Sequence, residues 1–487
     1  MLTQQQSIPL TAFAGLYDIV VPKKHLLRQI NELIDFSFIY DELVSKYCPD
    51  NGRRAESPIR LFKYLLLKVI ADSSDVDVVE RSMYDMSFKY FLGMTPEEEV
   101  IDPSTLTKFR KLRLQDTELL DMLIGKTVGI AIEKGIIKSN TIIVDATHSG
   151  SRSNPYSPLQ ALKLRSKQLR KCLYDTDESV KESLPPKNED DDLEHELAYT
   201  QALVDKVSED EILIHIPKIK ERLNLLKETL EDIQERYTTS KDKDARVGHK
   251  SCDDQFFGYK THIAMSPERI IVGAVVTSGE KSDGPQLPEL VDKSRRNGIA
   301  VDTVIGDTAY SGDSNLKQAK EEGFKIVAKL NPVISQGNRS ESEQWEYNKD
   351  AGMYVCPAGH IAVRKKRKNK GERGKNPALV YYFDTEKCKI CPLREGCYKE
   401  GQRQKSYSVT IKTETQQEQK SFQETEMFKE LQRTERYKIE AKNAELKNVS
   451  GYDRAESYGI DAMQMQGAIT MFAANLKRII RLLGETK

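Results

Sequence analysis

Two aspartates stand at the ends of short apolar segments, T-I-I-V-D at Asp145 and T-V-I-G-D at Asp307. Continuous apolar runs of this length are typical of central β-strands, and ligands of α/β sheets gather at the carboxyl ends of such strands. If the two strands are neighbours, the carboxylates lie close together, and their repulsion makes sense mainly where a divalent cation neutralises them. Oxygen ligands favour Mg²⁺ or Mn²⁺ over zinc. The alternative, for either aspartate alone, is the cap of a turn.

The segment R-T-E-R-Y-K-I-E-A-K-N-A-E-L-K (433–447) offers a third acid. On one helix turning about 100° per residue, one acid and three bases fall within an arc of roughly 60°: Glu440, Arg433, Arg436 and Lys447. Basic side chains beside a metal-binding acid suit a phosphodiester, whose charge metals and arginines can share. Ordinary i,i+4 pairing on a solvated helix is the alternative, although Glu435 and Glu445 lie off this stripe.

The elements that position these residues follow from apolar periodicity. Residues 25–132 are predicted to be helical, because apolar residues recur three and four apart at 58–70 and 117–130. Short apolar runs and one helical pattern predict a mixed α/β sheet. The runs lie at 141–145, 256–265, 270–278, 303–307 and 325–330, and the helical pattern at 287–298. Two segments interrupt the sheet, a charged helical hairpin at 158–237 and a strand-containing insertion at 334–415, and a final helical segment covers about 422–484.

Further basic and histidine side chains lie on predicted elements. Lys108 and Arg110 belong to a basic helix that begins near residue 102, where a solvated surface and a DNA-backbone contact are both open. Lys260 and His262, on the predicted strand 256–265, can approach the acids. We predict a structural role for His262 and a local hydrogen bond, not metal binding, for His148.

Most of the seven cysteines lie in one cluster, C-P-A-G-H (356–360) followed by C-K-I-C-P-L-R-E-G-C (388–397). A C-x2-C pair with two further cysteines in a basic, strand-rich segment suits a tetrahedral structural zinc. The predicted ligands, with His360 in reserve, are Cys356, Cys388, Cys391 and Cys397. Reduced cysteines without metal are the alternative. The adjoining basic run 364–370 is either a DNA-backbone contact or a solvated loop.

Composition limits the classes of protein. The 487 residues allow about two to four domains, and the 38% hydrophobic and 31% charged residues are typical of a soluble globular protein. The 75 basic and 75 acidic residues cancel, so only local patches can serve a nucleic-acid partner. No run approaches the ~18 apolar residues of a membrane span, and the N-terminus lacks a secretory signal. We therefore expect a cytoplasmic protein that contacts no membrane.

Taken together, three of these segments resemble the catalytic blocks of bacterial insertion-sequence DDE transposases, which share the ribonuclease-H-like fold of retroviral integrases. The blocks are V-D-A-T (144–147), G-D-T-A-Y (306–310) and R-x3-E-x6-K (436–447). Further similar segments, in the family's order, are S-D-V-D-V-V-E-R-S (74–82), F-L-G-M (91–94), D-P-S-T-L-T-K-F-R (102–110), K-D-K-D-A-R (241–246) and G-Y-K-T-H (258–262). The resemblance covers most of the chain. Arg433 stands where the family commonly has Tyr.

The resemblance implies a DNA transposase that cuts the ends of its own insertion element and joins them to target DNA. Asp145, Asp307 and Glu440 would hold two Mg²⁺ (or Mn²⁺) ions for phosphodiester hydrolysis and transesterification. The residues implied to contact DNA are Arg433, Arg436, Lys447, Lys260, Lys108 and Arg110. The implied partners are double-stranded DNA, as terminal inverted repeats and as target, and a second copy of the chain in a synaptic homodimer at the bacterial nucleoid.

The expected fold is α/β, with a ribonuclease-H-like mixed-sheet core, an N-terminal all-α domain and two insertions. The predicted regions are a helical DNA-binding domain (1–135), a first core segment (136–157), a helical hairpin insertion (158–240), a second core segment (241–333), a β-rich, basic, cysteine-containing insertion (334–420) and C-terminal core helices that carry Glu440 (421–487).

Other functions compete with transposition. A haloacid-dehalogenase-like phosphatase is excluded, because its chemistry needs a second Asp two residues after the nucleophile and position 147 is Thr. A catalytically inactive, transposase-derived DNA-binding protein is disfavoured by the intact Asp145, Asp307 and Glu440. A hydrolytic ribonuclease-H-like DNA nuclease stays open, because the same metals activate water, and strand transfer would separate it from a transposase.

Overall fold

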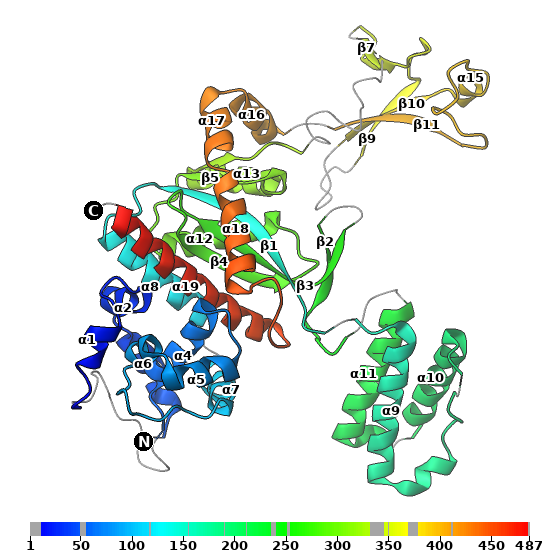
Figure 1. The fold of residues 1–487 in the computed structure, drawn as a ribbon. Helices are drawn as coiled ribbons and strands as arrows, with labels where there is room; N and C mark the ends of the chain where they lie inside the picture. Colours follow the sequence, from blue (N-terminus) through cyan, green and yellow to red (C-terminus); the bar gives the residue numbers. More distant parts are fainter. Residues whose placement is uncertain are drawn as a thin grey trace.

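A central sheet with helices packed against it forms the body of the molecule, and two insertions project from it (Figure 1). The computed structural model describes residues 11–48, 55–115, 118–153, 155–188, 190–210, 212–234, 240–250, 254–331, 345–348, 350–368, 378–410 and 413–485. Within these ranges, no helix has the length and apolar character needed to span a bilayer.

The N-terminal region is helical, which confirms the prediction from its periodicity. The helices are α1 (Leu16–Val20), α2 (Leu26–Leu33), α3 (Ser37–Leu43), α4 (Pro58–Ile70), α5 (Asp75–Tyr84), α6 (Met86–Leu92), α7 (Ser104–Phe109) and α8 (Leu119–Glu133). Helix α4 begins at Pro58, whose fixed φ suits a first helical turn. Helix α5 begins with a capping box, in which the side chains of Ser74 and Asp77 each accept the other's backbone N–H.

The central sheet is mixed, as predicted. Its strands are β1 (Thr141–Gly150), β2 (Arg246–His249), β3 (Gln255–Met265), β4 (Ile271–Ser278), β5 (Thr303–Ile305) and β6 (Lys325–Val327). Their order is β2-β3-β1-β5-β6, and β4 also pairs with β3. Strand β3 is antiparallel to β1, β2 and β4, whereas β1, β5 and β6 run parallel. The predicted helix 287–298 is α12 (Leu287–Arg296), and Gly298 beyond it has φ +93°.

The N-terminal helices and the sheet share one hydrophobic core. The last helix, α19 (Ile460–Glu485), joins them, because the Phe472 ring contacts those of Phe36 and Phe62. The buried Asn475 donates to Thr127 Oγ1 of α8 at 2.9 Å and to Ile271 O of β4 at 2.8 Å. A buried amide satisfied in this way fixes the helices to the sheet edge. The helical region is thus continuous with the core that positions the acids.

The hairpin predicted at 158–237 is wrong, because the structure has three helices there. They are α9 (Pro158–Thr176), α10 (Leu193–Ser208) and α11 (Pro217–Gln234). Helix α10 ends at Ser208, and α11 begins anew at Pro217, whose ring suits a first helical turn. These helices enclose an apolar cluster of their own, which includes Leu169, Leu203 and Leu226. Figure 1 shows them standing apart from the sheet.

The second insertion is strand-rich, as predicted. Its elements are β7 (Glu346–Asn348), β8 (Met353–Val355), β9 (Arg364–Lys368), β10 (Ala378–Phe383), α15 (Thr385–Lys389) and β11 (Lys405–Thr410). Strand β10 lies between β9 and β11 in an antiparallel sheet, and β7 and β8 form a separate hairpin. Within the basic run 364–370, residues 369 and 370 lie outside the described residues.

The predicted C-terminal helical segment, 422–484, is broken into shorter helices. After α13 (Asp313–Glu322) and the second insertion come α16 (Glu414–Gln423), α17 (Glu426–Thr434), α18 (Tyr437–Ser450) and α19. Thr425 caps α17 by accepting from Phe428 N, and Gly451 ends α18 with φ +63°. Caps of this kind begin and end helices independently of the apolar period. Periodicity alone therefore missed the breaks.

Candidate active site

Strand pairing sets Asp145 beside Asp307. Strands β1 and β5 are parallel neighbours in which Ile143 lies opposite Ile305, and each aspartate follows two residues later. The adjacency on which the predicted acid site depends is therefore confirmed. Asp307 also caps the short 3₁₀ helix Thr308–Ser311, and its Oδ1 accepts from Ala309 N at 2.9 Å.

The sequence prediction placed Asp145 at the end of its strand, and this is wrong. Strand β1 continues to Gly150, because β3 pairs with it through Gly258. Strand β5 stops at Ile305, so Asp145 stands where β1 loses its parallel neighbour and keeps its antiparallel one. Asp145 consequently lies on β1 just beyond the end of the shorter strand β5, and it caps no turn.

The carboxyl of Asp145 is in an unfavourable place for a negative charge. Only 17% of its side chain is exposed. Burial raises its pKa to about 6, and the charges of Asp307 and Asp283 add to this rise, while Arg436 opposes it. A group with these surroundings gains from any further cation.

Arg436 lies between two of the predicted acids. Its Nη2 is 3.6 Å from Asp145 Oδ1, and its Nη1 is 3.6 Å from Glu440 Oε1. Glu440 comes from the first turn of α18, and 66% of its side chain is exposed. Two of the predicted acids thus lie at one guanidinium, with Asp145 deeper and Glu440 more exposed, and the third, Asp307, lies near Asp145.

The predicted single helix through 433–447 is interrupted. Arg433 belongs to the last turn of α17, and Arg436 is the residue before the first turn of α18. The stripe of one acid and three bases is therefore divided between two helices. Arg433 is exposed, and no described contact ties it to the acids.

Three residues near the acids were not foreseen from the sequence. Asn443 donates from Nδ2 to Asp145 Oδ2 at 3.0 Å. The buried ring of Tyr310 has its pKa raised by burial and then by the charges of Asp283, Asp145 and Asp307. Spacing held the signal for two of them, since Asn443 follows Glu440 by three on one helix face and Tyr310 follows Asp307 by three. Asp283 lies in a loop without a comparable signal.

A basic pair lies at the far end of α18. Lys447 Nζ is 3.3 Å from His148 Nε2 and 3.4 Å from Nδ1. Burial, and then Lys447 and Lys250, lower the pKa of His148 to about 4, so its ring is neutral at pH 7. The ring also lies against Phe256, with centroids 4.8 Å apart. Lys447 leaves positive charge here that a phosphate can meet, whereas Lys250 is paired with Asp254 at 3.3 Å.

Lys260 and His262 approach the site by way of Asp283. Lys260 Nζ is 3.0 Å from Asp283 Oδ1, so its charge is already paired. His262 is fully buried, and its Nε2 hydrogen-bonds Thr277 Oγ1 at 3.0 Å. Its pKa is lowered to about 4 by burial, which makes a neutral, structural imidazole.

The two predicted basic residues of the N-terminal region are set apart from the acids. Arg110 donates to both carboxylate oxygens of Asp75 on α5, one of them at 3.1 Å. Lys108 is exposed on α7. Among the described contacts, none joins either side chain to Asp145, Asp307 or Glu440.

The donor set around Asp145 fits a hard divalent cation by its chemistry. It consists of carboxylate oxygens, and the electrostatic stress on Asp145 is of the kind that a cation relieves. Three buried polar atoms at the site, Tyr310 Oη, Asn443 Oδ1 and Arg436 Nη1, have no hydrogen-bond partner among the described residues. With the side chains as they stand in the described ranges, no group of three or more His, Cys, Asp or Glu residues is arranged to hold a metal.

The four predicted zinc ligands line a single cavity in the second insertion, together with His360. All four are free thiols. The pKa of Cys388 is raised by burial and then by Cys397 and Cys356, so the thiols lie within electrostatic reach of one another.

Two families of proteins match the chain. The one described as "Transposase domain (DUF772)" matches residues 16–112, and the one described as "Transposase DDE domain" matches residues 355–480. The second match spans the cysteine cluster and the segment from Arg436 to Lys447, but neither Asp145 nor Asp307. No curated protein matches the sequence.

Proposed function

Because the chain belongs to the insertion-sequence DDE transposases, we propose that it cuts the ends of its own element and joins them to target DNA by phosphodiester hydrolysis and transesterification. The family matches make it a DNA transposase. The chemistry, the residues that perform it and the ribonuclease-H-like character of the core are our proposal. The parallel pairing of β1 and β5 inside a mixed sheet supports that fold.

One observation carries the assignment of the site: Asp145 and Asp307 each lie two residues beyond the last paired residues of β1 and β5, and Arg436 reaches from Asp145 to Glu440. Arg436 thus links two of the acids, and Asp307 lies close enough to Asp145 to act on its charge. A structural ion-pair network would also bring acids to an arginine. The raised pKa of Asp145, about 6, next to two further acids favours a functional site over such a network.

Asp145, Asp307 and Glu440 would hold two Mg²⁺ or Mn²⁺ ions. When bound, such ions activate the attacking oxygen and stabilise the charge of the leaving oxygen. Asn443 orients Asp145 through the 3.0 Å hydrogen bond to Oδ2. Arg436 provides a guanidinium whose planar donors fit a phosphate, and its position between two acids brings that phosphate next to them.

The DNA path is proposed from the charges around the site. Arg436 and Lys447 lie on one side of α18, and Arg433 and the exposed Lys108 would extend the contact along the backbone. Lys260 and Arg110 are paired with Asp283 and Asp75, so they contribute to DNA binding only if those pairs open. A synaptic homodimer follows from the need to hold two element ends at once.

Strand transfer is the decisive experiment for the function. The full-length protein is incubated with Mg²⁺, a duplex carrying the DNA that flanks the gene, and a plasmid target. We expect cleaved ends and covalent joining of those ends to the plasmid. Glu440→Gln should abolish both products, whereas Glu435→Gln, which changes an acid paired with Lys438, should retain them.

Cleaved ends without any joined product would favour the hydrolytic nuclease. Binding of the flanking duplex without cleavage, under conditions in which the protein is folded, would favour the inactive DNA-binding protein.

A further inference from the structure

The second insertion has a small apolar interior. The buried hydrophobic side chains of its one cluster are Ala362, Tyr381, Phe383 and Tyr407. Modules of this size rarely gain more than about 3–5 kcal/mol from a single core and usually need a staple. The β7–β8 hairpin is weaker still, because an isolated pair of short strands is marginal in water. The aromatic contacts from the hairpin side are Trp345, stacked on Tyr407 with centroids 4.3 Å apart, and Tyr354 of β8, whose ring centroid is 5.0 Å from those of Tyr381 and Tyr407.

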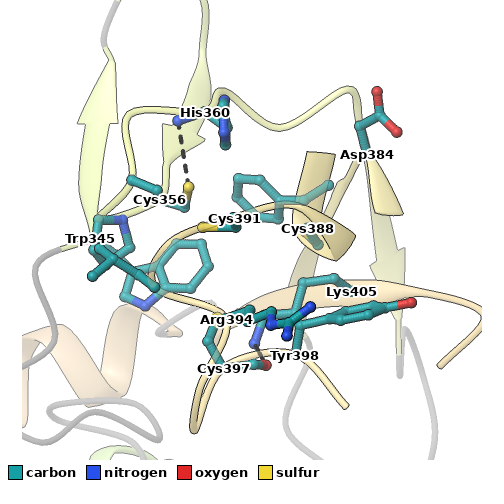
Figure 2. Close-up of a pocket in the computed structure, with 14 residues that line it drawn as sticks. Trp345, Cys356, His360, Asp384, Cys388, Cys391, Arg394, Cys397, Tyr398 and Lys405 are labelled. Carbon is teal, nitrogen blue, oxygen red and sulfur yellow. Dashed lines mark hydrogen bonds between the residues drawn. The ribbon is translucent and has the colours of Figure 1, made fainter. Parts of the chain in front are cut away.

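The four cysteines stand where these weakly joined pieces meet. Cys356 directly follows β8, Cys388 lies on α15 just after β10, and Cys391 and Cys397 lie in the loop before β11. Figure 2 shows them around one cavity, with Cys356 approaching from the hairpin, Cys388 from α15, and Cys391 and Cys397 from the loop that follows it. A single group bound to all four would tie the hairpin to the three-stranded sheet.

The local backbone is already shaped for thiolate ligands. The segment 356–360 turns back on itself, since Cys356 N donates to His360 O at 2.8 Å and Gly359 N donates to Cys356 O at 2.8 Å. This turn aims His360 N at Cys356 Sγ, at 3.3 Å. Gly359 makes the turn possible with φ +79°. An N–H donated to sulfur favours the thiolate, which is the form that binds metal.

The other three cysteines lie on α15 and the loop that follows it. Cys391 N donates to Cys388 O, and Cys397 N donates to Arg394 O at 3.0 Å. Lys405 donates from Nζ to Cys397 O at 2.5 Å and also lines the cavity. The positive charges of Lys405 and Arg394 offset the net negative charge that four thiolates would leave on a divalent cation.

We propose that Cys356, Cys388, Cys391 and Cys397 bind one structural Zn²⁺, which holds the β7–β8 hairpin against the β9–β10–β11 sheet. Four thiolates select zinc among the common divalent ions and hold it tetrahedrally. Because no described group is arranged to hold a metal with its side chains as they stand, binding draws the thiols inward by rotation about their Cα–Cβ bonds. His360 takes part through its backbone N–H and not through its ring.

The test measures zinc in the full-length protein, purified under reducing conditions, by elemental analysis. We expect one Zn²⁺ per chain in the wild type and in Cys48→Ser, an exposed cysteine of the N-terminal region. Zinc should fall at least tenfold in Cys388→Ser and Cys391→Ser. His360→Ala should keep its zinc, and loss of zinc in that variant with retention in Cys397→Ser would overturn the proposed ligand set.

Two readouts cover variants that fold poorly. Wild-type protein reconstituted with Co²⁺ should show a thiolate-to-cobalt charge-transfer band, and a strong chelator should expose the β7–β8 hairpin to protease while the sheet core resists. Wild-type protein that carries no zinc as purified under reducing conditions, and whose four thiols all react with an alkylating reagent although zinc has been supplied, would contradict the proposal. So would unchanged proteolysis after the metal is removed.

Discussion

Asp145 and Asp307 are positioned by paired strands inside a core that continues into the N-terminal helices, whereas the four cysteines sit on turns of a module with few buried apolar side chains. The acids are therefore placed by packing, and they carry an electrostatic cost that a metal would relieve. The cysteines are placed loosely, and a metal would supply the missing packing. Replacing a metal-ligating side chain should thus stabilise the metal-free fold when it is one of the acids, and destabilise the second insertion when it is one of the cysteines.

The largest effect is expected for Asp145→Asn, which should lower DNA cleavage at least about 100-fold, the usual loss when one electrostatic stabiliser is removed. The same change should stabilise the metal-free fold. The folded pKa of Asp145, about 6, lies above its ordinary value of 3.8, so its ionisation opposes folding above about pH 6 and has no effect below pH 3.8. Thermal melting without Mg²⁺ should show a gain of roughly 2–3 kcal/mol at pH 8 that disappears at acid pH. A lower melting temperature for Asp145→Asn than for the wild type at pH 8 would contradict the proposed electrostatic cost of Asp145.

A smaller loss is expected when Asp145 keeps its charge but loses its orienting partner. Asn443→Ala removes the hydrogen bond to Asp145 Oδ2 and should lower cleavage about 10- to 100-fold, as happens when a residue that orients a metal ligand is replaced. Asn448→Ala, an exposed residue later on α18, is the matched control and should cleave normally. Equal activity of the two variants would show that Asn443 does not position the acid.

The second insertion is expected to bind DNA through its basic side chains and to take no part in the cleavage reaction. All residues of β9 are exposed, so Lys366→Gln with Lys368→Gln should weaken DNA binding and make its salt dependence shallower by about 0.9 for each phosphate that is no longer bound. The pair Lys218→Gln and Lys220→Gln, exposed on α11, changes the net charge equally and should leave the slope unchanged. An equal change of the salt-dependence slope in both pairs of variants would show that β9 is a solvated strand that does not contact DNA.

The smallest effects are expected in the N-terminal helices, which share the core of the acid site. Arg110→Ala breaks the pair with Asp75 and should cost about 1 kcal/mol of stability on unfolding in urea. Lys108→Ala should change stability by less than about 0.5 kcal/mol and slightly weaken DNA binding. A larger loss of DNA affinity for Arg110→Ala at unchanged stability would make Arg110 a DNA contact.

The sequence predicted the elements of the sheet well, because buried strands must be apolar whatever surrounds them. It also indicated a site that forms if the strands before Asp145 and Asp307 are neighbours, which they are. It missed that β1 continues past Asp145, since the extension depends on pairing with β3, more than a hundred residues away. It missed Asp283, whose nearness to Asp145 is decided by the loop after β4.

Local residues that start or stop helices account for the other errors. A third helix begins at Pro217, so the predicted hairpin has three helices. The cap at Thr425 and the turn before Tyr437 divide the C-terminal segment. These features act over a few residues, whereas periodicity averages over many. The stripe that includes Arg433 and Glu440 was predicted on one helix for that reason, and Arg436 still reaches both Asp145 and Glu440 across the break.

The central claim is that the carboxylates of Asp145 on β1 and Asp307 after β5 belong to one DNA-cutting site, and a pair of variants on either side of β5 tests it most directly. Asp307→Asn changes the acid after the strand, and Asp302→Asn changes an exposed acid just before the same strand. With Mg²⁺ and the DNA flanking the gene, Asp302→Asn should cleave like the wild type, and Asp307→Asn should lose at least about 100-fold. Full cleavage by Asp307→Asn would contradict the account.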